Sequence, residues 1–318
     1  MPQTLAEYAA WLDGRGLLWP EVPPAVPVKA TPYAKPLPGI RAVTFEVYGT
    51  LLRVTGGRLT LDGPDRLSVQ IAVEKTVEEF NVWNSLFRKP GPPWQQVYEQ
   101  YKKLLDERRM TAAVRKGDVP EVDAAADLWR KLIAQWDRKE FRYDEATLGD
   151  RDALAEKIAY FFHSRLQGVE PAPNAARTAA VLAEGGIRAL LLSDGQCFTP
   201  VQLIRAFAAD GVAAASLVDF SISVLSCREG VRKPSPSLYE RGVERLRELG
   251  IGPDQTLHVG SRLKDDLAVA KRFGMRTALY AGDAASLEAT KDEVRDPRLA
   301  PDRLLTDLAQ LREVVGVG

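Results

Sequence analysis

Side chains that could do chemistry gather in four short segments of the sequence. In chain order these segments are Phe45–Leu52, Leu191–Gly195, Arg232–Pro234 and His258–Asp266. Together they offer carboxylates, hydroxyls and an ammonium group, which are the groups used in nucleophilic and acid–base work. The residues concerned are Glu46, Ser193, Asp194, Lys233, Ser261 and Asp266. Any one segment is typical of a turn, but four in this order and spacing are hard to obtain by chance.

The surrounding sequence predicts a scaffold that would bring these segments together. Residues 41–48 are rich in β-branched and aromatic side chains and end at Gly49, which is typical of a strand buried on both faces. Further strands are expected over residues 187–192, 220–224, 256–259 and 277–280. They alternate with helices expected over residues 174–184, 200–210, 236–249, 264–273 and 307–315, the first of them capped by Asn174. This alternation indicates right-handed crossovers and a doubly wound, Rossmann-like parallel sheet.

A helical block separates the first strand from the others. Apolar residues recur at three-to-four spacing over residues 67–80, 94–109, 122–137 and 152–165. Trp83, Trp94, Trp129 and Trp136 lie in this block, and we expect most of them in its core. The predicted fold class is therefore α/β, a doubly wound parallel sheet with an inserted α-helical cap domain. The cap is expected over the carboxyl ends of the strands, where open α/β folds bind ligands.

The chain begins with a proline-rich segment. Residues 20–38 carry seven prolines, which exclude a long helix or a central strand there. We expect a helix over residues 4–15, followed by an extended arm that Trp11 and Trp19 dock onto the body. The predicted domains are this arm (1–38), the α/β core (39–57 and 169–318) and the helical cap (58–168).

Composition narrows the function classes. The 318 residues are 45% hydrophobic and 27% charged, which is ordinary globular usage. Lys+Arg and Asp+Glu both total 43, so no net charge favours nucleic acid or an acidic membrane. No apolar run approaches the roughly 20 residues of a membrane helix. Cys197 and Cys227 have no metal or redox spacing. We expect a reduced, cytoplasmic protein, and its aromatic-rich cap leaves room for a homodimer.

The four motifs resemble those of the haloacid dehalogenase-like superfamily of hydrolases. The resemblance covers residues 40–55 and about 170–315, whereas the cap is alike in position only. It implies that Glu46 stands where the family has the Asp that attacks substrate and becomes an ester. It also implies that Ser193 and Thr50 bind the substrate anion and that Lys233 neutralises nucleophile and substrate. Asp266 is the later acid of the fourth motif, and we expect it to orient the hydrolytic water.

Within the superfamily, the motifs are more similar to the metal-independent dehalogenase branch. That branch has Tyr two residues after the nucleophile, Ser in place of the metal-binding Asp, and Tyr six residues after the lysine. Tyr48, Ser261 and Tyr239 stand at these places. Asp194 and Leu263 replace two asparagines of that branch. No halide-binding arginine can be placed in the cap, and Arg53 is a candidate by proximity to Glu46 alone.

Magnesium-dependent phosphatase chemistry meets two obstacles in this sequence. Attack of a carboxylate on a phosphate ester needs a strong cation, and Mg²⁺ needs several oxygen ligands in octahedral geometry. Ser261 removes one acid, and Glu46 is longer than the usual Asp. We therefore expect no cofactor, with Mg²⁺ as the alternative. Any metal would be held by Glu46, Asp266 and the Tyr48 carbonyl.

Glu46 leaves three readings open. Its side chain reaches about 1.5 Å further than that of Asp, and a misplacement of about 1 Å can cost about 10²-fold in rate. The protein is a slower enzyme, an enzyme repacked around an unusual nucleophile, or a binder without turnover. The predicted function is hydrolysis of a small anionic substrate by a dehalogenase-like, metal-independent route. The alternatives are a catalytically silent binding protein and a weak Mg²⁺-dependent phosphatase.

Two other groups have weaker functional readings. Cys197 and His258 lie near the same rim of the predicted site and would form a nucleophile pair there. His258 sits in an apolar strand, and burial with a hydrogen bond explains it better. His163 falls on a cap helix and has no visible partner in the sequence.

Overall fold

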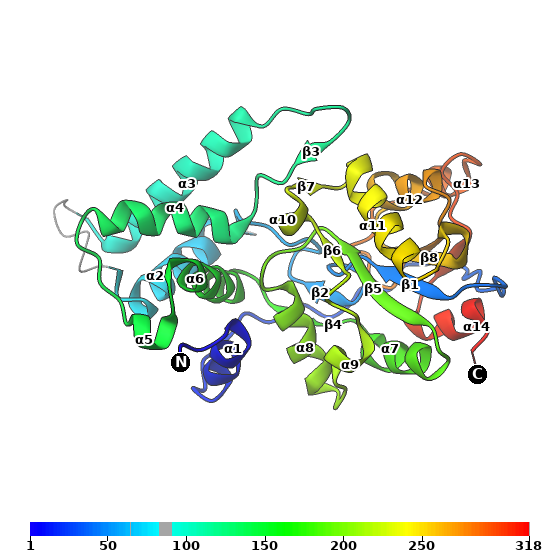
Figure 1. Ribbon diagram of the computed structural model, residues 1–318, viewed down its shortest axis with the longest axis horizontal. Helices are drawn as coiled ribbons and strands as arrows, with labels where there is room; N and C mark the ends of the chain where they lie inside the picture. Colours follow the sequence, from blue (N-terminus) through cyan, green and yellow to red (C-terminus); the bar gives the residue numbers. More distant parts are fainter. Residues whose placement is uncertain (64, 83–90, 318) are drawn as a thin grey trace.

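The computed structural model describes residues 1–63, 65–82 and 91–317. Trp83, expected in the cap core, lies outside these residues. Within them, a six-stranded parallel sheet forms the body of the molecule in the order β10-β9-β8-β1-β5-β6 (Figure 1). The strands are β1 (Ala42–Phe45), β5 (Arg188–Ser193), β6 (Val224–Leu225), β8 (Thr256–Gly260), β9 (Arg276–Tyr280) and β10 (Arg303–Leu305).

Helices cover both faces of this sheet, so the predicted doubly wound α/β fold is confirmed. Alternate residues of a strand point to opposite faces. Val43 and Leu191 pack with α7, α8 and α14, whereas Ala42 and Leu190 pack with α11 and α12. The core helices are α7 (Ala175–Glu184), α8 (Thr199–Ala209), α9 (Ala214–Leu217), α10 (Ser226–Glu229), α11 (Pro236–Glu248), α12 (Ala268–Arg272), α13 (Lys291–Arg295) and α14 (Leu311–Val315).

A separate group of helices stands at the carboxyl ends of the strands and is called the cap below (Figure 1). It contains α2 (Arg66–Glu79), α3 (Pro93–Thr111), α4 (Ala125–Asp137), α5 (Glu145–Leu148) and α6 (Arg151–Leu166). Its own hydrophobic core is rich in fully buried aromatic rings, among them Trp129, Trp136 and Phe162. Asp65 and Asp150 begin α2 and α6 by accepting hydrogen bonds from backbone amides of the first turn.

Two short antiparallel pairings connect the cap to the core. β2 (Leu52–Val54) pairs with β4 (Val169–Pro171), where the chain leaves and re-enters the core. β3 (Val119–Pro120), between α3 and α4, pairs with β7 (Val231–Arg232), which directly precedes Lys233. The cap segment thus reaches across to the chain that carries the candidate lysine (Figure 1).

The N-terminal segment lies against both parts of the molecule. α1 (Leu5–Asp13) begins with a capping box in which Thr4 and Glu7 bond each other's backbone amides. Asp13 forms an ion pair with Arg205 of α8, and Arg15 pairs with Glu79 of α2. The proline-rich arm then runs extended over the core, where Tyr33 bridges to Leu304 of β10.

Several predicted elements need correction. The strand expected over 220–224 is the shorter β6, and the helix expected from residue 122 begins at Ala125, because residues 119–120 form β3 and residues 122–123 form a turn. Asn174 has a left-handed backbone and no capping bond, and its amide donates to Asp307 instead. The helix expected over 264–273 is a π-helical turn, Leu263–Leu267, followed by α12.

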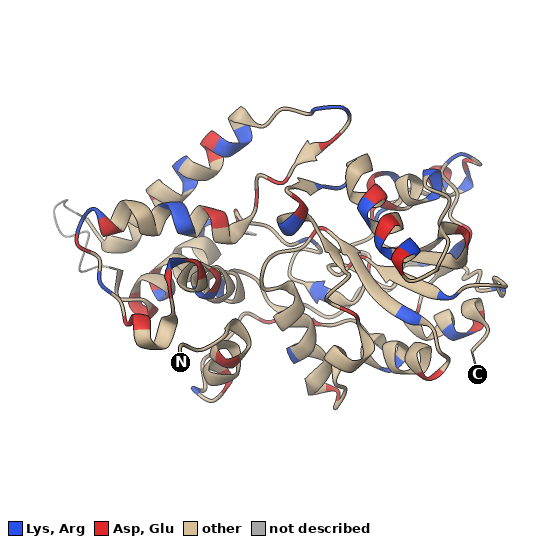
Figure 2. Cartoon of the chain, viewed as in Figure 1, with Lys and Arg blue, Asp and Glu red and all other residues tan. Residues whose placement is uncertain are grey.

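The remaining elements of the core are short turns and short helices, and many helices carry charges of both signs. The helix expected over 307–315 is a 3₁₀ turn, Leu308–Gln310, and α14; a further 3₁₀ turn covers Pro253–Gln255. Lys and Arg lie near Asp and Glu on many helices, whereas the strands of the sheet carry few charges (Figure 2). Among the described helices, none has the length and apolar character needed to cross a bilayer.

Candidate active site

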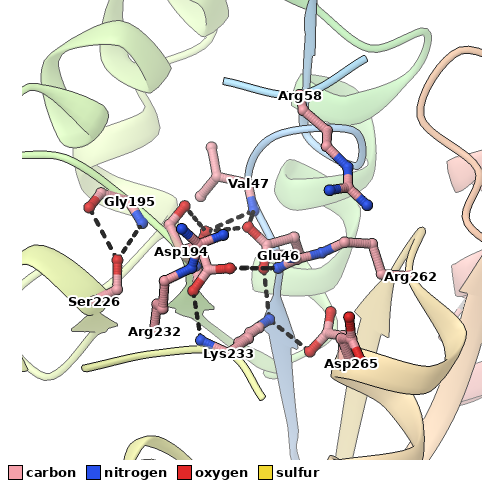
Figure 3. A network of polar contacts seen from close by, with 12 residues as sticks. Glu46, Val47, Arg58, Asp194, Gly195, Ser226, Arg232, Lys233, Arg262 and Asp265 are labelled. Carbon is pink, nitrogen blue, oxygen red and sulfur yellow. Dashed lines mark hydrogen bonds and ion pairs between the residues drawn. The ribbon is translucent and has the colours of Figure 1, made fainter. Parts of the chain in front are cut away.

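The four motif segments meet at the carboxyl edge of the sheet. Glu46 directly follows β1, Ser193 ends the neighbouring β5, and Arg262 follows β8 on the other side. Lys233 lies between β7 and α11. Because parallel strands end at one edge, side chains distant in sequence surround a single carboxylate, that of Glu46 (Figure 3).

The Glu46 carboxylate is held by several donors and is only 2% exposed. Ser193 Oγ donates to its Oε1 at 2.5 Å. Lys233 Nζ donates to Oε2 at 2.6 Å, and Arg262 Nη2 donates to the same oxygen at 3.0 Å. The Val47 backbone amide adds a longer bond to Oε1, at 3.3 Å. Charge-assisted bonds of this kind compensate the loss of water around a buried carboxylate.

Asp194 organises the two cations on the pocket side of Glu46. Its Oδ1 accepts a hydrogen bond from the Lys233 backbone amide at 2.8 Å. Its Oδ2 accepts one from Arg262 Nη2 at 2.8 Å, so the guanidinium bridges Asp194 and Glu46. The motif acid after Ser193 therefore orients Lys233 and Arg262 together.

A second, fully buried layer lies beyond Lys233. Asp266 Oδ1 lies 2.6 Å from Lys233 Nζ, 2.7 Å from His258 Nε2 and 2.9 Å from the Tyr239 hydroxyl that donates to it. Thr44 Oγ1 contacts the other His258 nitrogen at 2.8 Å. Burial opposes ionisation of Asp266, but the charges of His258 and Lys233 outweigh it and hold the pKa of that carboxyl well below its usual range. Asp266 Oδ2 has no hydrogen-bond partner among the described residues.

A pocket of about 500 Å³ opens above Glu46, between the core loops and the cap. Its wall carries both charge signs, and most guanidinium groups on it are paired with carboxylates. The ion pair of Arg232 is weaker than the others, because its guanidinium lies 3.5 Å from the Asp123 carboxylate. Burial raises the pKa of the Glu121 carboxyl on the cap side of the pocket. The charged residues of the wall are Glu46, Arg58, Arg109, Glu121, Asp123, Asp194, Arg232, Arg262 and Glu288.

The structure places the predicted site residues in three groups. Glu46, Tyr48, Asp194 and Ser261 line the pocket. Ser193, Lys233 and Asp266 lie beneath it in the chain of contacts around Glu46. Thr50 and Tyr239 are fully buried and are not part of the lining; Tyr239 contacts Asp266 instead.

Tyr48 reaches the pocket, but its hydroxyl belongs to the core. This hydroxyl lies 2.8 Å from Thr199 Oγ1 and donates to Gln202 Oε1 at 2.6 Å. Burial raises the pKa of the Tyr48 hydroxyl above its usual value. The phenol is therefore neutral, and Tyr48 presents its ring to the pocket while its hydroxyl is engaged.

The candidate role of Arg53 is wrong, and the disfavoured pair of Cys197 and His258 does not form. Arg53 points away from the pocket, and its guanidinium binds Asp283, Glu170 and the Pro23 carbonyl. Cys197 lines a different pocket, while His258 is bonded within the buried layer, so they form no nucleophile pair. Burial also raises the pKa of the Cys197 thiol well above its ordinary value, which disfavours the reactive thiolate.

The donor set around Glu46 does not suit Mg²⁺. Ser261 supplies no carboxylate, Glu46 and Asp194 are already neutralised by Arg262, and Asp266 Oδ1 is committed to Lys233 and His258. Among the described residues, no group of three or more His, Cys, Asp or Glu is arranged to hold a metal ion. Mg²⁺ requires near-octahedral oxygen ligation, which these residues do not present.

Sequence reasoning missed Arg262, although this residue stands within the fourth motif. It also gave no role to Arg232, which adjoins Lys233, or to Glu121, which comes from the cap segment. Arg262 had a detectable signal, since a basic residue directly follows the serine that replaces an acid. Glu121 had none, because its position depends on the pairing of β3 with β7.

Comparison with known proteins finds similarity over parts of the chain. A family model described as HAD-hydrolase-like matches residues 230–311. A glyceraldehyde 3-phosphate phosphatase of Pyrococcus furiosus is 25% identical over 163 residues, which are 51% of this chain and 61% of that protein. A second one, of Methanopyrus kandleri, is 34% identical over 89 residues, 27% of this chain and 37% of the relative. The chain thus spans less than two thirds of either relative.

Solved structures support the fold. The 2-haloacid dehalogenase of Pseudomonas syringae pv. Tomato DC3000 superposes with a TM-score of 0.51 at 22% identity, covering 86% of this chain and 97% of that one. The molecule is thus a capped, doubly wound α/β protein with a carboxylate at the end of its first strand. Its C-terminal part matches a HAD-hydrolase-like family model, and about half of the chain is similar to a phosphatase.

Proposed function

We propose that the protein hydrolyses a small anionic substrate with Glu46 as a carboxylate nucleophile, by a dehalogenase-like route that needs no metal. The observation that carries this proposal is the position of the Glu46 carboxylate. The carboxylate lines the pocket, and Ser193, Lys233 and Arg262 fix its position by donating hydrogen bonds to its two oxygens. A nucleophile fixed in this way meets its substrate with little reorganisation.

The reaction proceeds in two displacements. A Glu46 oxygen attacks the halogen-bearing carbon of a 2-haloacid, a C–O bond forms, and the halide leaves with the electron pair of the broken bond. Water then attacks the carbonyl carbon of the resulting Glu46 ester. This second step releases the 2-hydroxy acid and regenerates the carboxylate. The free Oδ2 of Asp266 is the acceptor proposed to orient this water, and one proton of the water passes to the alkoxide oxygen of the departing hydroxy acid.

Positive groups around the pocket favour an anionic substrate. Arg232 and Lys233 are adjacent in sequence; Arg232 lines the pocket and Lys233 lies beneath it. The weak 3.5 Å pairing of Arg232 leaves its guanidinium able to meet a substrate carboxylate. Ser193 is the hydroxyl proposed to contact the anion once it approaches Glu46.

An isotope experiment tests the ester. In a single turnover of 2-chloropropionate in ¹⁸O-labelled water, one label is expected in the Glu46 carboxyl, detected by mass spectrometry of its peptide. Glu46→Gln should lower release of the hydroxy acid at least about 10³-fold. Glu244→Gln, on the exposed face of α11, is the matched control and should retain full activity. Label in the product but none in Glu46 would replace the ester with direct attack by water.

A catalytically silent binding protein is the second candidate, and one observation favours it. Both oxygens of Glu46 already accept hydrogen bonds from charged or hydroxyl donors, which lowers their nucleophilicity. On this reading 2-chloropropionate binds in calorimetry without halide release, and Glu46→Asp gains turnover. Substantial turnover of the natural chain, lost in Glu46→Gln, excludes this candidate.

Because both relatives are named as phosphatases, the experiment should also include a phosphate ester as substrate. A weak Mg²⁺-dependent phosphatase would cleave an aryl phosphate faster with Mg²⁺ than with chelator. Equal rates under both conditions would remove that alternative.

A further inference from the structure

Arg262 is a cation built into the candidate site by the chain itself. It lies two residues beyond the end of β8, and its side chain is 14% exposed although it lines the pocket. A single nitrogen, Nη2, donates to Glu46 Oε2 at 3.0 Å and to Asp194 Oδ2 at 2.8 Å. The guanidinium therefore occupies the space between the two carboxylates that face the pocket.

The charge of Arg262 is permanent. A guanidinium does not lose its proton in proteins, and its planar fork suits binding to carboxylates. Burial alone would lower the pKa of Arg262, but Glu46, Asp194 and Asp266 outweigh it and hold that pKa well above its usual value. Around Glu46 the chain thus sets the cations Lys233 and Arg262 against the carboxylates Glu46, Asp194 and Asp266.

We propose that Arg262 is a positioning residue that supplies the fixed positive charge beside Glu46, so that the site neither needs nor binds a divalent cation. This inference deepens the proposed function and rests on it for the reaction. Its geometric basis is independent, because a guanidinium between Glu46 and Asp194 repels a second cation there. Ser261, the preceding residue, offers only a hydroxyl where an acid would be needed.

The geometry also defines how Arg262 acts. It touches Glu46 on the same oxygen as Lys233, while Ser193 binds the other oxygen. Removing the guanidinium takes away one of the two cationic donors to Glu46 Oε2 and leaves the Asp194 carboxylate without its cation. We therefore expect the loss in kcat rather than in KM.

Activity provides the first test. Formation of the 2-hydroxy acid from 2-bromopropionate is measured in chelator for the natural chain and for Arg262→Ala, Arg262→Gln and the control Arg241→Ala, an exposed residue of α11. Arg262→Ala should lose about 10²-fold in kcat, with KM changed less than about threefold. Guanidinium acetate should restore at least a tenth of the lost rate, and the control should match the natural chain. Full activity of Arg262→Ala, or loss without guanidinium rescue, would overturn the role.

Metal binding provides the second test, and it does not depend on turnover. Calorimetric titration with MgCl₂ should show no binding to the natural chain up to 10 mM, whereas Ser261→Asp/Arg262→Ala should bind Mg²⁺. Binding by the natural chain, or none by the double variant, would contradict the inference. If 2-bromopropionate is not turned over at all, the proposed reaction fails and the titration alone decides about Arg262. If the alanine variants do not fold, Arg262→Gln replaces Arg262→Ala, by itself in the first test and together with Ser261→Asp in the second, and the titration of the natural chain still decides.

Discussion

His163 is a titratable residue sealed inside the molecule. It lies on α6, fully buried, with its ring 4.9 Å from that of Phe198, and neither ring nitrogen has a hydrogen-bond partner among the described residues. Burial lowers the pKa of His163 to about 3, far below its value of about 6.5 in an unfolded chain. The folded protein therefore holds this imidazole neutral, and only the unfolded chain takes up the proton between these two values.

This difference predicts a pH-dependent loss of stability that His163→Phe abolishes. Above pH 6.5 the residue is neutral in both states and contributes no slope. As the pH falls from 6.5 towards 3, the unfolded state alone gains a proton, so the free energy of unfolding drops by about 1.4 kcal/mol per pH unit. Urea unfolding at pH 5, 6, 7 and 8 should show the gap between His163→Phe and the natural chain widening below pH 6.5.

Tyr160→Phe is the matched control for this experiment. It removes another buried polar atom of α6 that has no partner among the described residues, but one that does not titrate near pH 6. Its unfolding free energy should run parallel to that of the natural chain across the four pH values. Parallel behaviour of His163→Phe would show that His163 is protonated, or reached by water, in the folded state.

For single residues, the position of a side chain in a motif predicts that it lies in the site. It does not predict every partner that the side chain binds there. Glu46, Ser193 and Lys233 could be expected together because they adjoin strand ends of one parallel sheet. Arg53 could not be placed from its distance along the chain, because β2 turns away from the pocket to pair with β4. Arg262 had a signal in the fourth motif, but the two carboxylates that its guanidinium joins could be identified only from the structure.

Among the elements, the segment between α3 and α4 has the most direct link to the site. β3 pairs with β7, and the Val119 amide donates to Ser235 Oγ at 2.8 Å. Gln196, in the loop after β5, accepts from the Ala125 amide at 2.8 Å and donates to the Asp123 carbonyl at 2.9 Å. These contacts connect the cap to both loops that carry Ser193 and Lys233.

We expect Gln196→Ala to loosen this connection. The change leaves the buried Ala125 amide and the Asp123 carbonyl without their partner, at a cost of about 1–3 kcal/mol. Hydrogen exchange followed by mass spectrometry should show faster exchange in peptides covering residues 117–127. Gln202→Ala is the matched control, because Gln202 is a buried glutamine that bonds Tyr48 within the core. Unchanged exchange in Gln196→Ala would mean that β3 and β7 hold the segment without help.

The limits of sequence-based prediction differ between long and short elements. The amphipathic helices α4 and α11 could be predicted because many turns repeat one apolar face. β3 and β7 have two residues each, which is too short for any alternation to be seen. The π-helical turn before α12 was likewise unpredictable, because a single inserted residue does not change the apolar spacing in a recognisable way.

On the scale of the whole molecule, three connections between cap and core add to the hydrogen bonds of Gln196. The first is the β2–β4 pair, the second is the β3–β7 pair, and the third is the N-terminal segment. In that segment Arg165 of α6 donates to the Leu18 carbonyl, and a side chain at Gly168 would clash with Pro20 and Glu21. The arm thus packs against the segment where the chain passes from the cap back to the core. This contact favours a cap that keeps its position over the pocket.

Arg53 links the arm, the crossing and the core, and its loss should affect all three. Arg53 and Asp283 are both nearly buried, and the Asp283 carboxylate also accepts from the Val26 amide of the arm. Arg53→Met leaves that carboxylate buried without its cation, a loss of about 3–5 kcal/mol. Burial raises the pKa of Asp283. The hydrogen bonds from backbone amides and the charge of Arg53 lower that pKa by more than burial raises it. The net pKa is thus below normal, and the stability that this carboxyl provides is present at neutral pH and lost as the pH falls through its range.

Two measurements follow the consequences of Arg53→Met at neutral pH. The melting temperature should fall by several degrees, and limited trypsin digestion should cut the arm after Lys29, which precedes an alanine, earlier than in the natural chain. Arg298→Met is the control, since that exposed arginine pairs with nearby Asp296 and should change neither readout. Adding Asp283→Leu to Arg53→Met should recover much of the melting temperature, because it removes the buried charge that has no partner. The arm should still be cut easily by trypsin, because the hydrogen bonds to Pro23 and Val26 are absent. If the double variant is as unstable as Arg53→Met, the stability lost with Arg53 comes from Glu170 and Pro23 rather than from the buried ion pair.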